Sequence, residues 1–94
     1  MATLQIEHPI TDLDTWLGAF AKFEQARANA GVLEHRVRRP VDDEKYILVS
    51  LEFATVEQAE GFKAFLEANV WTSPEASPAL AGKPVARVLT DVSA

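Results

Sequence analysis

The stretch Tyr46–Phe53 constrains the fold more than any other part of this sequence. It is rich in β-branched and aromatic residues, which predicts a strand long enough to cross a small sheet. One alternating set of its side chains is wholly apolar and the other is mixed. The mixed set is less polar than that of a solvent-facing strand and more polar than that of a strand buried on both faces. We therefore expect helices over one side and a semi-polar enclosed space, or a partner subunit, over the other. The apolar set is Ile47, Val49, Leu51 and Phe53, and the mixed set is Tyr46, Leu48, Ser50 and Glu52.

The N-terminal third predicts a strand followed by a long helix. Apolar and polar residues alternate over positions 3–8, which is the period of a half-buried strand, and Pro9 ends it because proline cannot donate to a sheet ladder. Thr11 is the expected cap of a helix over residues 12–30, and Gly31 is its expected left-handed C-terminal residue. The apolar stripe of this helix consists of Leu13, Trp16, Leu17, Phe20 and Phe23.

The rest of the chain repeats this layout around the central strand. Residues 32–39 predict a strand, and the polar residues 41–45, which include Asp42, Asp43 and Glu44, predict the turn of a hairpin. Thr55 then opens a second helix through a capping box with Gln58. The apolar stripe of the second helix consists of Val56, Ala59, Phe62, Leu66 and Val70.

The C-terminal third predicts a long loop before a last strand. Trp71 lies at or just past the end of the second helix. Residues 72–84 are rich in Pro, Ser, Ala and Gly and form the loop, with one helical turn that Ser73 caps. Residues 85–92 form the last strand.

The predicted order, β-α-β-β-α-β, is that of a ferredoxin-like α+β domain, a four-stranded antiparallel sheet with both helices on one face. We expect residues 1–94 to form one such domain. The other face stays bare, and Tyr46, Leu48 and Leu89 lie on it in this prediction. A partly apolar bare face is an interaction surface, and two-fold dimers are the commonest oligomers, so we expect a homodimer.

The composition narrows the classes of function. The chain has 94 residues, no cysteine and a formal net charge of -5. An acidic chain is poorly suited to bind nucleic-acid phosphates or anionic membranes, and the absence of cysteine excludes disulfides and thiolate metal sites. Two histidines without a matching carboxylate motif are a weak signal for a metal site. The sequence shows no bilayer-spanning apolar run and no secretory signal pattern, so we expect a cytoplasmic protein without a metal.

Several local features accompany this order of elements: Leu13-Asp14-Thr15-Trp16 with Phe20, the strand Tyr46–Phe53, and Trp71-Thr72-Ser73-Pro74-Glu75. With them the sequence resembles the dimeric α/β barrel superfamily, which includes antibiotic-biosynthesis monooxygenases. The resemblance implies a homodimer whose two sheets form a barrel around a ligand-sized cavity, and we expect no cofactor. Members of the superfamily include cofactor-independent oxygenases, haem-degrading enzymes, polyketide cyclases, isomerases and dehalogenases, so the fold alone does not choose the reaction.

Missing residues disfavour the haem-degrading branch of that superfamily. Its signature is a Trp, an Asn and a His, and Trp71 is the residue here that corresponds to the Trp. Residues 76–80 lack the expected histidine, and residues 4–7 lack the expected asparagine and offer only Gln5.

Four side chains are candidate catalytic acids or bases: His8, His35, Tyr46 and Glu52. Histidine is the commonest acid–base group near neutral pH, and the strands of His8 and His35 can lie close enough to share a site. The alternative is a strand-end His8 and a partly buried His35, each hydrogen-bonded to the backbone. On the mixed face, Tyr46 would donate a proton, and Glu52 would act as a base if desolvation raises its pKa. Hydrogen bonds across a dimer interface are the alternative role for these two.

Arg36 and Arg38 share one face of the second predicted strand. If that face lines the barrel, their guanidinium groups would hold a carboxylate or an enolate-like substrate. The alternative is a solvated edge, or ion pairs with carboxylates drawn from Glu7, Glu34, Glu52 and Asp91.

The sequence leaves two functions open. In the first, the barrel binds a small aromatic or polyketide-like molecule, and transforms it without a cofactor. In the second, the dimer is a non-enzymatic module with a filled barrel, and no cavity reaches roughly 300 Å³, the lower end for ligand sites. The apolar walls predicted for the first function are Trp71, Tyr46, Leu48 and Leu89, and its polar contacts are His8, His35 and Arg36.

Overall fold

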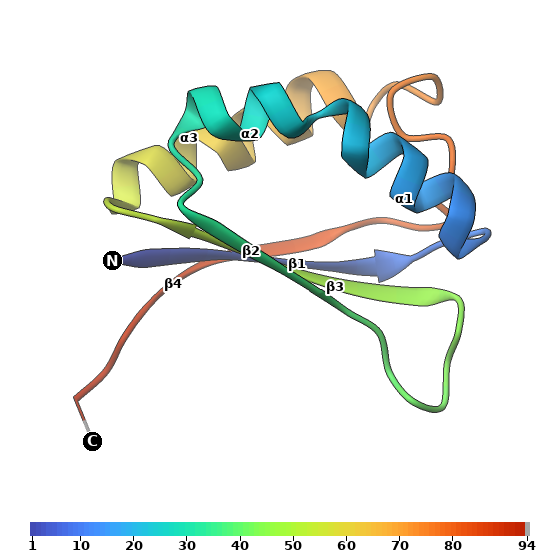
Figure 1. Ribbon diagram of the computed structural model, residues 1–94, viewed down its shortest axis with the longest axis horizontal. Helices are drawn as coiled ribbons and strands as arrows, with labels where there is room; N and C mark the ends of the chain where they lie inside the picture. Colours follow the sequence, from blue (N-terminus) through green and yellow to red (C-terminus); the bar gives the residue numbers. More distant parts are fainter. Residues whose placement is uncertain (94) are drawn as a thin grey trace.

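A four-stranded antiparallel sheet carries every helical segment of the described residues, 1–93, on one of its faces (Figure 1). In this computed structural model the elements are β1 (Ala2–Pro9), α1 (Leu13–Lys22), α2 (Glu24–Ala30), β2 (Glu34–Arg38), β3 (Tyr46–Phe53), α3 (Val56–Phe65), η1 (Leu66–Val70) and β4 (Val85–Thr90). The strand order is β2-β3-β1-β4, so β1 and β3 are central. This is the predicted ferredoxin-like α+β arrangement, with the first helix divided in two.

The alternation of β3 decides how the sheet and the helices meet. Its apolar set faces the helices, where no member is more than 3% exposed, and its mixed set faces away and is half-buried. In the antiparallel register, Leu4 and Ile6 of β1 lie beside Leu51 and Val49 of β3, so the buried sets of both central strands form one surface. The hydrophobic core therefore lies between the sheet and the helix layer, and the opposite face of the sheet is bare. We call this second surface the open face.

The helix caps follow the predicted chemistry, with one shift in position. Asp12, not Thr11, is the N-cap of α1, because the helix begins at Leu13 and the Asp12 carboxylate accepts a hydrogen bond from the Thr15 amide at 2.8 Å. That hydrogen bond lowers the pKa of Asp12. The Thr55 capping box with Gln58 is confirmed in both directions.

A break at Phe23 corrects the prediction of one continuous helix over residues 12–30. Phe23 has φ −97° and ψ 12°, and it ends α1 and precedes α2. The Phe20 carbonyl at this break accepts hydrogen bonds from the Phe23 amide at 3.2 Å and from the Arg27 guanidinium at 2.6 Å. The second helical segment then ends as predicted at Gly31, whose φ of 95° is left-handed.

Several other boundaries and faces differ from the prediction. The strands β2 and β4 are shorter than the predicted 32–39 and 85–92, and two residues assigned to the helix stripes, Leu17 and Val56, are exposed. Within the loop after η1, the Ser73 side chain accepts a hydrogen bond from the Ala76 amide, in keeping with the predicted turn. No helix among residues 1–93 has the length and apolar character needed to cross a membrane.

Candidate functional site

A cavity of about 80 Å³ lies between the sheet and the helix layer. Its walls are mainly apolar, and its polar side chains are His8, Arg27 and Ser77. Several lining side chains are only half-buried, so the cavity opens to solvent. The apolar lining consists of Ile6, Trp16, Ala19, Phe20, Phe23, Val49, Leu51, Phe62, Leu66, Val70, Trp71, Ala76, Ala79 and Leu80.

Stacked planar groups form one wall of this cavity. The rings of Trp16 and Phe20 stack with their centroids 4.9 Å apart and an interplanar angle of 18°. The guanidinium carbon of Arg27 lies 3.6 Å from the centroid of the Phe20 ring, which is a cation–π contact. Since the guanidinium covers one face of Phe20, the indole occupies the other. The exposed ring of His35 meets Phe20 edge-on, with centroids 5.4 Å apart.

A π-helical turn brings Trp71 to the same cavity. The turn η1 follows α3 directly, and the Trp71 amide donates to the Leu66 carbonyl at 2.9 Å, an i to i+5 hydrogen bond. In an α-helix, residue i+5 would lie about 140° around the axis from residue i. The wider turn brings Trp71 back over Leu66, so that Leu66, Val70 and Trp71 all line the cavity.

His8 presents a neutral imidazole to the cavity. Its side chain is 5% exposed, because His8 belongs to the buried set of β1. The ring atom Nδ1 lies 2.9 Å from the Pro9 carbonyl, which can only accept, so Nδ1 carries the proton and Nε2 is an acceptor. Burial lowers the pKa of His8, and the bond to Pro9 opposes this only in part. At neutral pH the ring is therefore uncharged and offers Nε2 to a ligand.

Arg27 brings a buried cation to the same cavity, and sequence reasoning missed it. It is 7% exposed, and burial lowers its pKa, with the charge of Glu24 opposing this. A guanidinium nevertheless stays charged at neutral pH. Its position in the sequence indicates burial, because Arg27 comes four residues after Phe23, where the apolar stripe of the helix continues.

The polar residues of the open face hydrogen-bond to one another across β1 and β3. The Tyr46 hydroxyl donates to Glu7 at 2.8 Å, and the Thr3 hydroxyl donates to Glu52 at 2.7 Å. The bond to the Glu7 carboxylate raises the pKa of Tyr46, because deprotonation would bring two negative charges together. Tyr46 and Glu52 thus have partners inside one chain.

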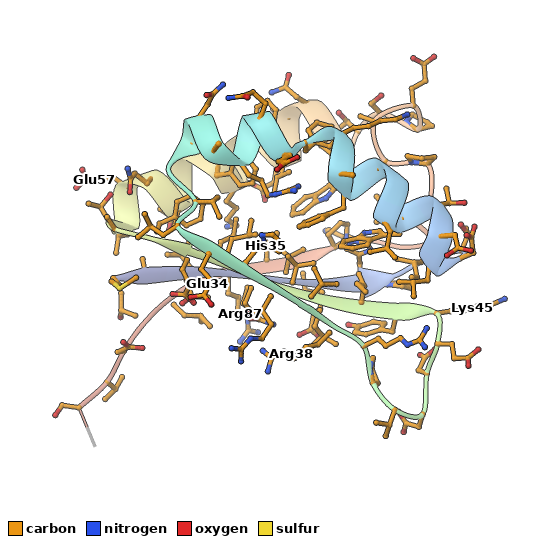
Figure 2. The ribbon with its side chains drawn as sticks, viewed as in Figure 1. Glu34, His35, Arg38, Lys45, Glu57 and Arg87 are labelled. Atoms are coloured by element: carbon orange, nitrogen blue, oxygen red, sulfur yellow. The ribbon has the colours of Figure 1, made fainter. Side chains whose placement is uncertain are left out.

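The arginines of β2 lie on the open face beside a shallow groove. Arg36 pairs in register with Ser50 and Arg38 with Leu48, which puts both on the face predicted for them. Figure 2 shows Arg38 on the side of the sheet away from the helices, together with Arg87 of β4. A groove of about 290 Å³ adjoins these strands, and its lining includes Glu34, Arg36, Arg38, Ser50 and Glu52.

The sheet divides the side chains that the sequence analysis had assigned to one site. His8 and Trp71 line the helix-side cavity, whereas Tyr46, Leu48, Glu52, Leu89, Arg36 and Arg38 lie on the open face. The predicted wall that combined Trp71 with Tyr46 is therefore wrong.

The two histidines do not share a site either. Strand β3 lies between their strands, with His8 opposite Ile47 and His35 opposite Leu51. His35 is exposed rather than partly buried, because it lies on an edge strand. Within residues 1–93, no three His, Asp or Glu side chains come together as metal ligands.

No protein-family model and no curated protein matches this sequence. Similar solved structures include an antibiotic biosynthesis monooxygenase, with a TM-score of 0.69, 10% identity, and coverage of 99% of this chain and 100% of that chain. A dimeric ferredoxin-like protein from an uncultured marine organism has a TM-score of 0.65, 16% identity, and coverage of 99% and 95%. A second such protein has a TM-score of 0.63, 12% identity, and coverage of 100% and 97%. At these identities the likeness concerns the fold, and the chain has the ferredoxin-like fold of these proteins, as the resemblance in the sequence predicted.

Proposed function

We propose that this protein binds a small aromatic molecule in the cavity between its sheet and its helix layer. One observation carries the proposal: an open cavity has stacked aromatic rings along one wall and a single neutral histidine among its polar groups. Aromatic rings pack favourably against other rings in offset or edge-on arrangements. Ligand sites typically combine such apolar walls with a few polar groups that fix orientation.

His8 would orient a hydroxyl group of the ligand. A neutral imidazole with its proton on Nδ1 accepts a hydrogen bond at Nε2, and a phenolic or enolic O–H is a suitable donor. The lowered pKa makes the ring a weaker base than a free histidine, so its main role in this proposal is positioning. A cofactor-free reaction of the bound molecule is the further step that this arrangement allows.

The volume of the cavity is smaller than a single ring needs. The cavity measures about 80 Å³, whereas a cavity of about 150 Å³ binds benzene and drug-sized ligands occupy at least roughly 300 Å³. In this proposal a single ring therefore enters through the opening and displaces part of the wall. The loop after η1 supplies part of the wall through Ala76, Ala79 and Leu80, so movement of this loop would admit a larger group.

Self-association through the open face is part of the same proposal. The face exposes Val85 and Leu89 of β4, and Leu48 lies half-buried at its centre. Two of the similar structures are dimeric ferredoxin-like proteins. A short chain gains stability by burying such a surface against a second copy.

Binding of phenol tests the proposal, with the two tryptophans as reporters. Trp16 and Trp71 are the two tryptophans of the sequence and both line the cavity, so their indole N–H signals in NMR report on it. We expect saturable shifts of both signals with phenol. Ala19→Phe should weaken binding by about tenfold or more, because a new ring would fill the cavity.

Ala64→Phe is the control, since Ala64 is also a helical alanine but is exposed and does not line the cavity. Binding to this variant should equal binding to the unmodified protein. An absence of saturable shifts, or equal binding by both variants, would contradict the proposal.

The second candidate is a non-enzymatic dimeric module with a filled barrel. The pairing of Tyr46 with Glu7 and of Thr3 with Glu52 favours it, because these polar groups have partners before any ligand arrives. The groove of about 290 Å³ on that face would then be filled by the second copy. This candidate predicts a stable dimer that binds no aromatic probe.

A further inference from the structure

We infer that the ligand of the helix-side cavity carries an acidic group, ionised at neutral pH, that binds the guanidinium of Arg27. This inference rests on the proposed function and names the chemical class of its ligand, a small aromatic acid.

The environment of Arg27 is unusual for a buried cation. Buried charges are normally paired, because removing an ion from water is unfavourable without a compensating partner. Arg27 is 7% exposed, yet its contacts are a neutral carbonyl and a ring, both from Phe20. The carboxylate whose charge affects its pKa is Glu24, an exposed residue in the first turn of α2.

The remaining donors of Arg27 are accessible to a ligand. A guanidinium has five N–H donors, and the Phe20 carbonyl is the partner of one nitrogen, Nη1. Within residues 1–93, no fully buried side-chain nitrogen or oxygen lacks a hydrogen-bond partner. The Arg27 nitrogens without a partner, Nε and Nη2, are therefore not fully buried, and Arg27 lines the open cavity.

The charge of the cavity favours an anion. The lining described above contains no Asp or Glu, and His8 is neutral at pH 7. Arg27 is thus the one formal charge among the lining side chains. A carboxylate that entered would replace water around the guanidinium with charge-assisted hydrogen bonds, in the two-point geometry that arginine forms with planar anions.

Arg27 also has a structural role, and the experiment separates the two. Its guanidinium is a second donor to the Phe20 carbonyl at the end of α1, which also accepts from the Phe23 amide. That role needs one donor and no ligand. An anion-binding role needs the free donors, and it predicts that charge on the ligand matters.

The test compares benzoate with benzamide, its neutral analogue of similar shape, by the indole N–H signals of Trp16 and Trp71. We expect benzoate to bind the unmodified protein about tenfold or more tightly, because hydrogen bonds between a guanidinium and a carboxylate are stronger than those to a neutral amide. Equal affinities, or tighter binding of benzamide, would overturn the inference. This comparison uses the unmodified protein and does not depend on whether a variant folds.

Two variants then assign the preference to one residue. Arg27→Met should abolish the preference for benzoate, whereas Arg39→Met, which removes an exposed arginine outside the cavity, should keep it. Arg27→Lys keeps the charge and should retain a reduced preference. A preference that persists unchanged in folded Arg27→Met would also overturn the inference.

Different results would contradict the proposed function and the inference about the acidic group. If phenol binds and benzoate binds no more tightly than benzamide, the cavity is an aromatic site and the inference that its ligand carries an acidic group is wrong. If neither phenol nor benzoate shifts the two tryptophan signals, both the proposed function and the inference are wrong.

Discussion

The two faces of the sheet differ in how their polar side chains are satisfied. On the open face, side chains bond to side chains: Tyr46 donates to Glu7, and Thr3 donates to Glu52. On the helix side, His8 and Arg27 bond instead to backbone carbonyls, those of Pro9 and Phe20. A side chain that uses one nitrogen on the backbone still has another for a ligand. On the helix side, the unused nitrogens of His8 and Arg27 therefore lie beside the apolar walls of the cavity.

This difference arises from the period of two in a β-strand. Neighbouring residues of β1 and β3 point to opposite faces, so a single strand supplies both environments. Glu7 and His8 are adjacent in sequence, yet Glu7 bonds to Tyr46 on the open face and His8 lines the cavity. Four substitutions, taken from the largest expected effect to the smallest, test whether the two faces act independently.

Phe53→Ala should have the largest effect on stability. Phe53 is 0% exposed and packs against Phe62 of α3, with ring centroids 6.1 Å apart. Truncation of a buried phenylalanine typically lowers the free energy of unfolding by about 3–5 kcal/mol. Chemical denaturation measures this loss in the free energy of unfolding. Val41→Ala is the control, because Val41 is fully exposed. A loss below about 1 kcal/mol would show that the helix face is less tightly packed than described.

Leu48→Asp should weaken self-association about tenfold or more, which corresponds to about 1.4 kcal/mol. Leu48 lies at the centre of the open face, where a dimer would bury the new charge without a partner. Sedimentation equilibrium measures the dissociation constant. Leu17→Asp is the matched control, because Leu17 is exposed on α1. A monomeric unmodified protein at micromolar concentration would refute the role assigned to the open face.

His8 should make stability depend on pH on the helix side. Burial lowers its pKa below the ordinary 6.5, so the unfolded chain binds the proton more readily than the folded one. Its contribution to stability is therefore complete above about pH 6.5 and is lost as the pH falls toward the folded pKa. One such group changes the free energy of unfolding by at most about 1.4 kcal/mol per pH unit.

Denaturation at several pH values between 7 and 5 measures this dependence. His8→Gln should flatten the profile, because it removes the buried imidazole whose pKa the fold lowers. Parallel profiles for the unmodified protein and His8→Gln would contradict the environment described for His8.

Tyr46→Phe should have the smallest effect, a loss of about 0.5–1.5 kcal/mol in the free energy of unfolding from one hydrogen bond. The substitution removes the donor to Glu7 on the open face. Binding of phenol in the helix-side cavity should stay unchanged, since Tyr46 does not line it. Titration of Tyr46→Phe with phenol measures this, and weakened binding would show that the two faces are coupled.

Local patterns predicted much of the fold. The order of the elements, the two faces of β3 and the capping box at Thr55 depend on periodicity and on residues within one turn of each other, so a single sequence reveals them. The break at Phe23 was not predictable in this way. It involves a carbonyl that the side chain of Arg27 satisfies from the next helix.

The candidate site was predicted less well, because its location depends on packing between layers. His8 and Trp71 were identified as candidates, but both were assigned to the barrel between two sheets. Arg27 was overlooked because a charged residue in a helix is usually exposed, although its place on the apolar stripe contradicted that rule. The cavity on the helix side depends on how α1, η1 and the loop 72–84 pack together. No local sequence pattern predicts this packing.

The π-helical turn η1 has a consequence for comparing this protein with its relatives. The direction of the Trp71 side chain depends on how many residues the turn contains, because one residue fewer would restore an α-helical turn and rotate the indole away. A homologue in which an α-helical turn precedes the tryptophan would lack that wall of the cavity. Deletion of one codon in this turn would therefore change the shape of the cavity without substituting any of its other lining residues.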